Sequence, residues 1–335
     1  MESFPRIEPK GKSRKILERI NSVAVHASDL DGLASAALIF LMKPSVKIDY
    51  LTVSEALNSY GGYDLVIDLP KIGDAINIDH HKTNYDRLAL EGRLSDMDLV
   101  DPNTPSAAIL VARYFGIEDD PHVMKIVDMA TKSDLGKYDD KIYAIDKVIK
   151  CNSRNKAKLH KIMLAIAMYA DEPERDEWLR SEIERIRPVF EICKKVSRSV
   201  TNVVLNELGI KYMVVHIASG IPRICVGDIM HDFMGSGGKV VVLINTMRDK
   251  DEYCPSLTEN MGRSRARISI RSAEKSFDAR EVLEFYGGGG HRQAAGAKVS
   301  LDLLPEFMLF IFRKLSEFGS VVYLRVDEKF VKELG

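Results

Sequence analysis

The stretch that decides the fold is AINIDHHKTN, which covers residues 75–84. Its apolar start runs directly into Asp79, His80 and His81, the pattern of a buried β-strand that ends on polar side chains. A single histidine there could be an ordinary core residue. Two adjacent histidines cannot both face the core, because successive side chains of a strand point to opposite sides. At least one of them is expected to reach a site at the end of the strand.

Two earlier stretches end in the same way. VAVHA leads into SDLDG, which crowds His26, Asp29 and Asp31 into one turn, and YDLVIDLP ends its apolar run on Asp68. Since parallel strands present their carboxyl ends at one edge of a sheet, these groups are expected to meet there. Aspartate and glycine are also common in ordinary turns, so the first turn alone does not distinguish a ligand site from a plain turn.

A fourth stretch, DMATKSDLGKY, contains two further acids, Asp128 and Asp134, either of which could be a helix cap or a turn residue. The candidate ligands are then His26, Asp29, Asp31, Asp68, His80 and one of these two acids. Such a set is too large for one open catalytic ion and suits two bridged ions. Carboxylate and imidazole ligands without thiolate favour manganese or magnesium over structural zinc.

Near the C-terminal end, the stretch GRSRARISIRS has arginines at alternate positions, namely Arg263, Arg265, Arg267 and Arg271. This spacing predicts a β-strand with one cationic face. A strand face that is merely solvated normally mixes both signs of charge, and no acid interrupts this one. Arginine side chains on such a face suit bidentate binding of phosphate or carboxylate.

Four consecutive glycines follow in the stretch FYGGGGHRQAAGAKV, at residues 287–290. Taken alone, they could be a flexible hinge. Together with the arginine strand, they are expected to let a ligand approach the backbone closely. Their N–H groups and a following helix start would then offer an anion site beside His291.

Composition narrows the class of protein. The chain has 335 residues and a formal net charge of −1, from 48 Lys and Arg against 49 Asp and Glu. The length suggests two domains, and the balanced charge argues against a protein that coats long nucleic acid. The longest apolar runs, such as 307–312, are too short to cross a membrane, and no apolar signal stretch follows the basic N-terminus. We expect a cytoplasmic protein without a membrane partner.

The four cysteines are Cys151, Cys193, Cys225 and Cys254. They form no C-x-x-C pair, so the sequence contains neither a thiolate zinc motif nor a redox motif. We expect them to be reduced and mostly buried thiols.

The apolar pattern predicts an α/β protein: a parallel-sheet N-terminal domain over residues 1–175, a helical linker over 176–206 and a smaller α/β domain over 207–335. In the first domain, strands are expected at 23–27, 46–53, 65–67 and 75–78, and helices at 32–42 and 105–115. In the last domain, strands are expected at 212–217, 239–245, 266–271 and 321–326, and a helix at 304–318.

Local signals mark some helix ends. Thr104 before Pro105 predicts a helix start, with the hydroxyl as the cap and proline at the first helical position. In the linker, Pro173 and Pro188 are the expected helix breaks.

The triplet Asp79-His80-His81, with the D-x-D turn and the strand-end Asp68 before it, resembles the DHH phosphoesterase superfamily. The resemblance implies that two manganese ions are held by His26, Asp29, Asp31, Asp68, His80 and Asp134. Asp68 would bridge the ions, Asp79 would orient the ligands, and His81 would contact substrate phosphate. The first turn is one residue shorter than in many members and lacks their proline, and Asp128 stays a rival to Asp134.

The arginine strand, the glycine run with His291 and a turn at Ala294-Ala295-Gly296 resemble the C-terminal domain of one major DHH subfamily. That domain binds the nucleotide, so the resemblance implies an active site in the cleft between the two domains. The matching substrate-binding positions are Arg267, Arg271, Ser272, Gly288, Gly289, Gly290 and His291.

The resemblance implies a two-metal phosphodiesterase, with Mn²⁺ as the cofactor and Mg²⁺ as the alternative. Its substrates would be short single-stranded RNA or DNA or dinucleotides, cleaved to 5′-mononucleotides, or 3′-phosphoadenosine 5′-phosphate. A RecJ-type single-strand exonuclease and a non-catalytic nucleotide-binding relative are the alternatives. The absence of a basic surplus favours short substrates. A homodimer is left open.

Overall fold

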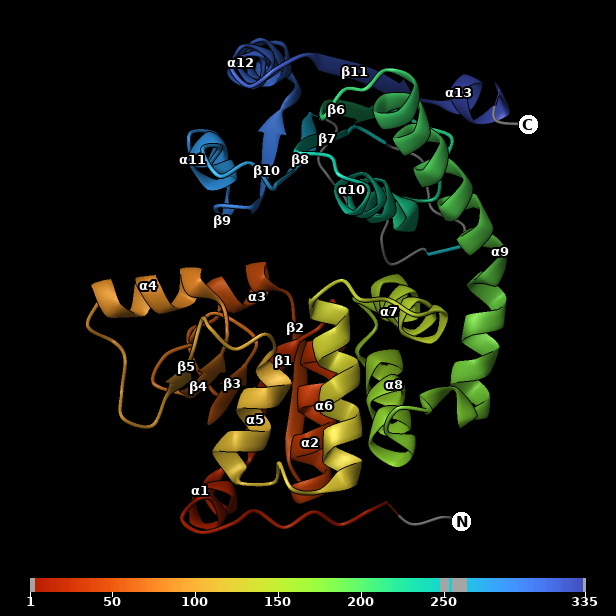
Figure 1. Ribbon diagram of the computed structural model, residues 1–335. Helices are drawn as coiled ribbons and strands as arrows, with labels where there is room; N and C mark the ends of the chain where they lie inside the picture. The colour runs from red at the N-terminus through yellow and green to blue at the C-terminus, as the bar shows by residue number, and fades with distance from the viewer. Residues whose placement is uncertain (1–3, 248–252, 255–263, 334–335) are drawn as a thin grey trace. The chain divides into compact units, whose positions relative to one another are not determined.

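The computed structural model describes residues 4–247, 253–254 and 264–333 (Figure 1). The internal contacts of the chain divide it into two compact units, Met1–Arg185 and Ile186–Gly335. Each unit is built around its own sheet. The α/β class and the two-domain arrangement predicted from the sequence are thereby confirmed, whereas the predicted cleft between the domains stays a prediction.

The first unit contains a five-stranded sheet in the order β2-β1-β3-β4-β5. Its strands are β1 Ser22–His26, β2 Lys47–Leu51, β3 Leu65–Ile67, β4 Ile76–Asp79 and β5 Leu99–Val100. Every neighbouring pair is parallel. Because all the strands run the same way, the residues that follow β1, β3 and β4 lie at one edge of the sheet.

Helices cover this sheet (Figure 1). They are α1 Ser13–Arg19, α2 Leu30–Met42, α3 Val53–Leu57, α4 Lys82–Leu90, α5 Ala107–Phe115, α6 Pro121–Asp134, α7 Asp140–Asn152 and α8 Lys156–Tyr169. Helix α2 is buried along almost its whole length and packs against β1, α5, α6 and α8. It is apolar nearly all round because it has neighbours on several sides.

The start of α5 differs from the prediction. The helix begins at Ala107, and the Thr104 hydroxyl does not cap it but donates a hydrogen bond to Asp101 at 2.7 Å. The N–H groups of Ala107 and Ala108 instead donate to the Asp31 carboxylate, at 2.6 and 2.9 Å. An acid from a distant part of the chain therefore satisfies the first turn of α5, which a local capping rule does not anticipate.

The stretch predicted as a helical linker is helical: α9 Glu177–Thr201 continues into the π-helical turn η2 Asn202–Glu207. Its role as a separate linker stays a prediction, because the boundary between the two compact units falls inside α9, after Arg185. Pro173 begins the short 3₁₀ helix η1 Pro173–Arg175, but Pro188 lies inside α9 and does not break it. The predicted break at Pro188 is therefore wrong. An interior proline costs about 3 kcal/mol, and here the helix keeps a continuous buried stripe. The stripe consists of Ile186, Val189, Cys193, Val196 and Val200.

The second unit contains a six-stranded mixed sheet in the order β11-β6-β7-β8-β10-β9. Its strands are β6 Tyr212–Ile217, β7 Val240–Asn245, β8 Arg265–Ser272, β9 Gly289–His291, β10 Ala294–Ser300 and β11 Val321–Val326. Its helical segments are η3 Arg223–Cys225, α10 Val226–Gly235, α11 Ala279–Glu284, η5 Leu301–Leu303, α12 Leu304–Ser316 and α13 Glu328–Glu333. β11, β6 and β7 are parallel, and the remaining pairs are antiparallel.

Strand β8 has the two faces that the sequence predicted. Ala266, Ile268 and Ile270 are buried in the core that also contains residues of α11 and α12. Arg267 and Arg271 lie on the opposite face and are exposed. Arg263 lies outside the described residues.

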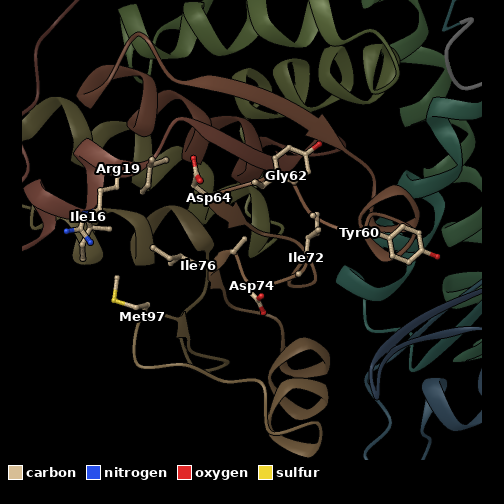
Figure 2. Close-up of a pocket in the computed structure, with 14 residues that line it drawn as sticks. Ile16, Arg19, Tyr60, Gly62, Asp64, Ile72, Asp74, Ile76 and Met97 are labelled. Carbon is tan, nitrogen blue, oxygen red and sulfur yellow. The ribbon is translucent and has the colours of Figure 1, made fainter.

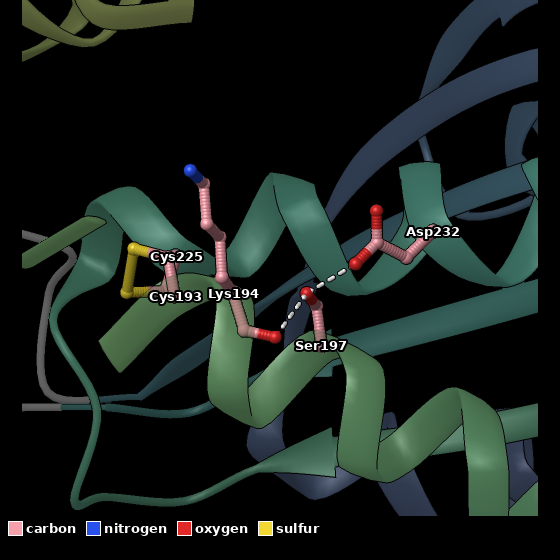
Figure 3. Close-up of a disulfide and its surroundings, with 5 residues drawn as sticks. All are labelled: Cys193, Lys194, Ser197, Cys225 and Asp232. Atoms are coloured by element: carbon pink, nitrogen blue, oxygen red, sulfur yellow. Dashed lines mark hydrogen bonds between the residues drawn. A yellow bond between two sulfur atoms is a disulfide. The ribbon is translucent and has the colours of Figure 1, made fainter. Parts of the chain in front are cut away.

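The prediction of reduced cysteines is wrong, because none of the described cysteines is a free thiol. Cys193 on α9 and Cys225 at the end of η3 form a disulfide (Figure 3). One turn along α9, Ser197 donates a hydrogen bond to Asp232 of α10. Two links therefore join α9 to the α10 region within the second unit. The expectation rested on the absence of closely spaced cysteine pairs, but a disulfide requires only that the fold bring two cysteines together.

Within the described residues, no helix is both long enough and apolar enough to span a membrane.

Candidate functional site

The polar groups singled out in the first unit gather at the carboxyl edge of its sheet. They are His26 at the end of β1, Asp29 and Asp31 at the start of α2, Asp68 after β3, Asp79, His80 and His81 at the end of β4, and Asp134 at the end of α6. Their ligand atoms form three groups in which all atoms lie within 4.8 Å of one another. We call His26, Asp29, Asp31, Asp68, His80, His81 and Asp134 the carboxylate–histidine cluster.

The first group joins the end of β1 to the start of α2. Nδ1 of His26 lies 2.7 Å from Oδ2 of Asp29 and 3.4 Å from Oδ2 of Asp68. Asp29 is also the N-cap of α2 and accepts a hydrogen bond from the N–H of Gly32. A Cβ atom at Gly32 would lie only 2.2 Å from the carbonyl oxygen of His26. Glycine therefore permits the tight turn that brings His26 and Asp29 together.

The second group joins β4 to two helices. Nε2 of His80 lies 3.1 Å from Oδ2 of Asp134 and 3.8 Å from Oδ2 of Asp31. Asp31 is fully buried, and the N–H groups at the start of α5 hold its carboxylate in place. Asp31 thus attaches the cluster to the start of α5.

Asp68 belongs to two of the three groups. Its Oδ1 lies 3.5 Å from Nε2 of His80 and 3.5 Å from Nδ1 of His81. The residue is 2% exposed, and Oδ1 has no hydrogen-bond partner among the described residues. Its φ of 56° is in the left-handed region, which is uncommon for a residue with a side chain. A buried carboxylate oxygen without a donor, held on a strained backbone, is the arrangement expected of a cation ligand.

Asp79 contacts the cluster differently. Its Oδ1 accepts the backbone N–H of His80 at 2.8 Å and lies 2.7 Å from Nδ1 of His81. Its Oδ2 accepts a hydrogen bond from Asn84 at 2.7 Å. Since neighbouring donors engage both of its oxygens, Asp79 orients the His80-His81 segment.

The acids and histidines of the cluster shift one another's pKa values. Burial alone would lower the pKa of His80, but Asp134 and Asp68 raise it to about 11. Burial alone would raise the pKa of Asp68, but His26 and His80 hold it well below its usual range. Burial raises the pKa of Asp134 to about 6. Without a metal, protonated histidines therefore supply the positive charge that these buried acids need.

The rival acid Asp128 is not part of the cluster. Its carboxylate pairs with Lys132 at 2.6 Å, and its side chain is 60% exposed. Both acids lie on α6, but only Asp134, the last residue of that helix, lies beside His80.

Some of the predicted substrate-binding side chains of the second unit are exposed, and others are buried and already hydrogen-bonded. Arg267 and Arg271 are exposed on β8. Ser272 is buried, and its hydroxyl exchanges hydrogen bonds with the N–H and carbonyl of Glu274. Its side chain therefore stabilises the turn after β8.

The glycine run has a different structure from the predicted one. No helix begins after it, because Gly289–His291 is strand β9, which pairs with β10 as a hairpin. Residues 294–296 are part of β10 and do not form a turn. The predicted anion site at a helix start is therefore wrong. The side chain of His291 lies outside the described part of the structure.

Internal packing accounts for most of these glycines. Gly287 has a φ of +70°. A Cβ atom at Gly288 would lie 2.5 Å from the carbonyl oxygen of Gly296, and one at Gly290 would lie 2.4 Å from that of Ala294. Only at Gly289 does the added atom meet open space without a strained φ. Gly289 is thus the member of the run that neither packing nor a positive φ explains.

Sequence reasoning missed the polar residues beneath the cluster. Asn77 lies inside the apolar stretch that forms β4 and is fully buried, and Lys71 and Asp98 form a buried ion pair at 2.6 Å. An asparagine in the middle of an apolar strand was the available signal, because a buried amide requires hydrogen-bond partners.

A cavity of about 560 Å³ lies near the opposite edge of this sheet (Figure 2). Its lining includes Arg19, Tyr60, Asp64 and Asp74, from α1 and the loops before β3 and β4. The Asp64 carboxylate already accepts the N–H groups of Asn21 and Ser22. No predicted site residue lines this cavity.

Comparison with known proteins adds to this geometry. The fold is similar to that of the pGpG-specific phosphodiesterase PggH from Vibrio cholerae, with 14% identity, a TM-score of 0.55, and coverage of 89% of this chain and 99% of that chain. Residues 209–317 match the DHHA1 domain. The matched stretch lies wholly within the second unit. No curated protein matches this chain.

The fold is also similar to that of RecJ from Thermus thermophilus. The structure with Mn²⁺ has 16% identity and a TM-score of 0.55, and the structure with Mg²⁺ has 15% identity and a TM-score of 0.53. Each match covers 94% of this chain but only 55% or 52% of the RecJ chain. This chain thus spans about half the length of that RecJ.

Proposed function

We propose that this protein is a two-metal phosphodiesterase of the DHH superfamily that hydrolyses short oligonucleotides or dinucleotides to 5′-mononucleotides. Removal of the 3′-phosphate of 3′-phosphoadenosine 5′-phosphate, a phosphomonoester, is a further activity that we propose for the same site. The observation that carries the proposal is Asp68, which belongs to two groups of ligand atoms and has a buried Oδ1 without a hydrogen-bond partner among the described residues.

The residues present fit two divalent ions. His26, Asp29 and Asp68 would hold one ion. Asp31, His80 and Asp134 would hold the other and share Asp68 with the first. Carboxylate and imidazole donors suit Mn²⁺, with Mg²⁺ as the alternative. When bound, the ions would activate water and neutralise charge on the phosphate.

His81 has a separate role in the proposal. Burial alone would lower its pKa, but the bond to Asp79 raises it above its usual value, which favours the protonated form. Its side chain is 38% exposed. A protonated His81 oriented by Asp79 would donate a hydrogen bond to a phosphate oxygen and stabilise the charge that develops there.

In the DHHA1 domain, Arg267 and Arg271 would bind substrate phosphate, because arginine forks match phosphate oxygens. Gly289 would allow the substrate to approach the backbone of β9. His291 is proposed as a further substrate contact from its place in the motif.

The similar proteins support this chemistry. The Vibrio protein is named a pGpG-specific phosphodiesterase, and the RecJ structures contain Mn²⁺ or Mg²⁺. A RecJ-type exonuclease is the second candidate. The balanced charge favours short substrates over long strands. The complete set of Asp and His ligands disfavours a non-catalytic relative.

A chromatographic time course with Mn²⁺ tests the proposal. Dinucleotides to pentanucleotides of RNA and DNA, a long single strand, a cyclic dinucleotide and 3′-phosphoadenosine 5′-phosphate would be compared side by side, with Asp68→Asn as the inactive control. We expect the fastest release of 5′-mononucleotides from the short linear substrates. Faster cleavage of the long strand would favour the exonuclease, and no metal-dependent hydrolysis of any substrate would contradict the proposal.

A further inference from the structure

Two buried asparagines are bonded to each other and reach the carboxylate–histidine cluster through Asp79. Nδ2 of Asn84 donates to Oδ1 of Asn77 and to Oδ2 of Asp79, both at 2.7 Å. Nδ2 of Asn77 donates to the carbonyl oxygens of Val66 and Leu69, at 3.2 and 3.1 Å. The amide orientations are chemically fixed, because a carboxylate or carbonyl oxygen can only accept here. We call Asn77 and Asn84 the amide pair.

The amide pair spans the turn that carries Asp68. Val66 and Leu69 lie on either side of Asp68 in the chain, so the Asn77 amide holds both ends of this turn. Asp68 has a φ of 56°, and its N–H donates to the carbonyl of Ile78 at 2.9 Å. A strained backbone persists only where the surroundings fix it firmly. Asn77 supplies part of that constraint.

The other end of the amide pair determines where His81 lies. Asn84 holds one oxygen of Asp79, and the other oxygen of Asp79 lies 2.7 Å from Nδ1 of His81. Oδ1 of Asn84 accepts a hydrogen bond from Arg87 at 3.1 Å. The backbone N–H of Asn77 donates to Asp98 at 2.8 Å. These bonds tie the pair to Arg87 on α4 and to Asp98 just before β5, so neither residue can move without losing several partners.

We propose that Asn77 and Asn84 are positioning residues that couple Asp68 to the Asp79–His81 pair. The inference rests on the proposed function, since it assigns Asp68 to metal binding and His81 to the substrate. One buried link then sets the distance between the metal site and the phosphate donor. Hydrogen bonds that orient metal ligands commonly change metal affinity or activity by about 10- to 100-fold.

Single and double alanine variants test the coupling, with Mn²⁺ affinity measured by calorimetry and kinetics on the best short substrate. Asn77→Ala is expected to weaken Mn²⁺ binding about tenfold or more, because the Asp68 turn loosens. Asn84→Ala is expected to lower kcat by a similar factor with Mn²⁺ affinity nearly unchanged. In kcat/KM at subsaturating Mn²⁺, to which both losses contribute, the double variant should be less impaired than the product of the two single effects, because the residues bond to each other.

Asn206→Ala is the matched control, since that amide is exposed on η2. Asn77→Ser and Asn84→Ser replace the alanine variants if those fail to fold. Folded variants with wild-type Mn²⁺ affinity and wild-type kcat would overturn the proposal, as would fully independent effects in the double variant. If the wild-type chain binds Mn²⁺ but hydrolyses nothing, the proposed function fails, and Mn²⁺ affinity still tests the link between Asn77 and Asp68.

An independent feature lies on the outer face of α12 in the second unit. Leu309 and Phe310 are 71% and 40% exposed, and Phe285 after α11 is 80% exposed. The Tyr286 ring lies between the two phenylalanines, with centroid distances of 5.2 Å to Phe285 and 6.3 Å to Phe310. These side chains form an exposed apolar patch, which is typical of an interaction surface.

The charges beside the patch are self-complementary. Glu306 and Arg313 are exposed on α12, one on each side of Leu309 and Phe310. Neither forms an ion pair with another described residue. If a second copy of α12 packed antiparallel about a two-fold axis, each Glu306 would face Arg313 of the second copy, and the apolar residues would meet at the centre.

We infer that this face of α12 binds a second copy of the chain. The contact is isologous, because the same residues serve on both copies. One helix face with a neighbouring aromatic buries less than a standard interface, so the dimer is expected to be weak and concentration-dependent.

A charge-swap series followed by analytical ultracentrifugation tests this inference. The wild type should form more dimer as its concentration rises, and Glu306→Arg or Arg313→Glu alone should abolish it. The double swap should restore the dimer, because the two charges would again face each other. Glu118→Arg, on an exposed loop of the first unit, should have no effect. A wild type that stays monomeric, or a double swap that does not restore the dimer, would overturn the inference.

Discussion

Sequence motifs predicted functional residues both in the carboxylate–histidine cluster and in strands β8, β9 and β10, which we call the hairpin region. The structure accounts for the two sets of residues in different ways. In the cluster, acids and imidazoles from several elements are buried together, and Asp68 retains an oxygen that nothing within the described residues satisfies. In the hairpin region, most of the glycines are required by the backbone itself, at Gly288 and Gly290 through close contacts with β10.

The two regions differ in whether contacts within the fold already satisfy the residues of the motif. A residue that its own fold satisfies, such as Ser272 or Gly288, carries little information about ligands. A carboxylate oxygen that the fold buries without a hydrogen bond, such as Oδ1 of Asp68, remains free to bind a cation. Substitutions in the cluster should therefore affect metal binding and turnover, whereas most substitutions in the glycine run should affect stability.

The largest effect is expected at Asp68. Asp68→Ala should abolish hydrolysis, because both proposed metal positions lose a shared ligand. The fold should survive, because the change removes a buried acid that lies among other acids and occupies a strained turn. Steady-state kinetics and thermal unfolding measure the two properties. Residual turnover near the wild-type rate would rule out the bridging role.

The next largest effect on kcat should distinguish Asp134 from Asp128, which both lie on α6. Asp134→Asn should lower kcat about 100-fold or more, because it weakens a proposed metal ligand. Asp128→Asn should leave kcat unchanged, since that carboxylate pairs with Lys132 in solvent. Kinetics at saturating Mn²⁺ compare the two variants. An equal loss in both would mean that the cluster is not the catalytic centre.

Metal affinity should depend on pH in a defined direction. Because neighbouring acids raise the pKa of His80 to about 11, this imidazole is protonated between pH 6 and 8 in the metal-free protein. A metal must displace that proton, so Mn²⁺ affinity should rise about tenfold per pH unit over this range. Calorimetry in buffers of different ionisation enthalpy should detect the released proton. An affinity that does not change with pH would contradict this assignment.

Within the glycine run, stability and substrate binding should separate. Gly288→Ala should destabilise the second unit by about 1 to 3 kcal/mol, because its Cβ atom would collide with the backbone of β10. Gly289→Ala should leave the free energy of unfolding nearly unchanged and act only on KM. Chemical denaturation and kinetics of both variants test this. Equal destabilisation would mean that Gly289 is also a packing residue.

The smallest effect is expected for a single exposed arginine. Arg271→Ala should raise KM about tenfold, as expected for the loss of one charge-assisted contact, while the free energy of unfolding stays the same. Arg271→Lys should recover part of the affinity, because it keeps the charge but loses the bidentate geometry. An unchanged KM in both variants would remove Arg271 from the substrate site.

Much of the fold followed from apolar patterning. Strand β6 at Tyr212–Ile217 and strand β3 at Leu65–Ile67 have the predicted bounds, because uninterrupted apolar runs in buried strands leave little choice of register. Pro188 was misread, because a local rule cannot weigh the buried stripe that holds α9 together. The start of α5 was misread because its cap, Asp31, is distant in sequence.

The sequence indicated which residues gather at the candidate site, but it did not indicate the hydrogen bonds between them. Asp68 and His80 follow separate strands, and parallel topology brings such ends together. No sequence rule indicates that Asn77 and Asn84 bond to each other or that Ser272 is occupied by its own turn. These outcomes depend on contacts between side chains and backbone that form only in the folded chain.

The central claim is that the cluster around Asp68 holds two divalent ions in one site. Low-temperature electron paramagnetic resonance during a Mn²⁺ titration tests it most directly. The account predicts two Mn²⁺ per wild-type chain with the spectrum of a coupled pair, as for ions about 4 Å apart, and loss of the coupling in Asp68→Ala. One ion per chain, or two uncoupled ions in the wild type, would contradict it.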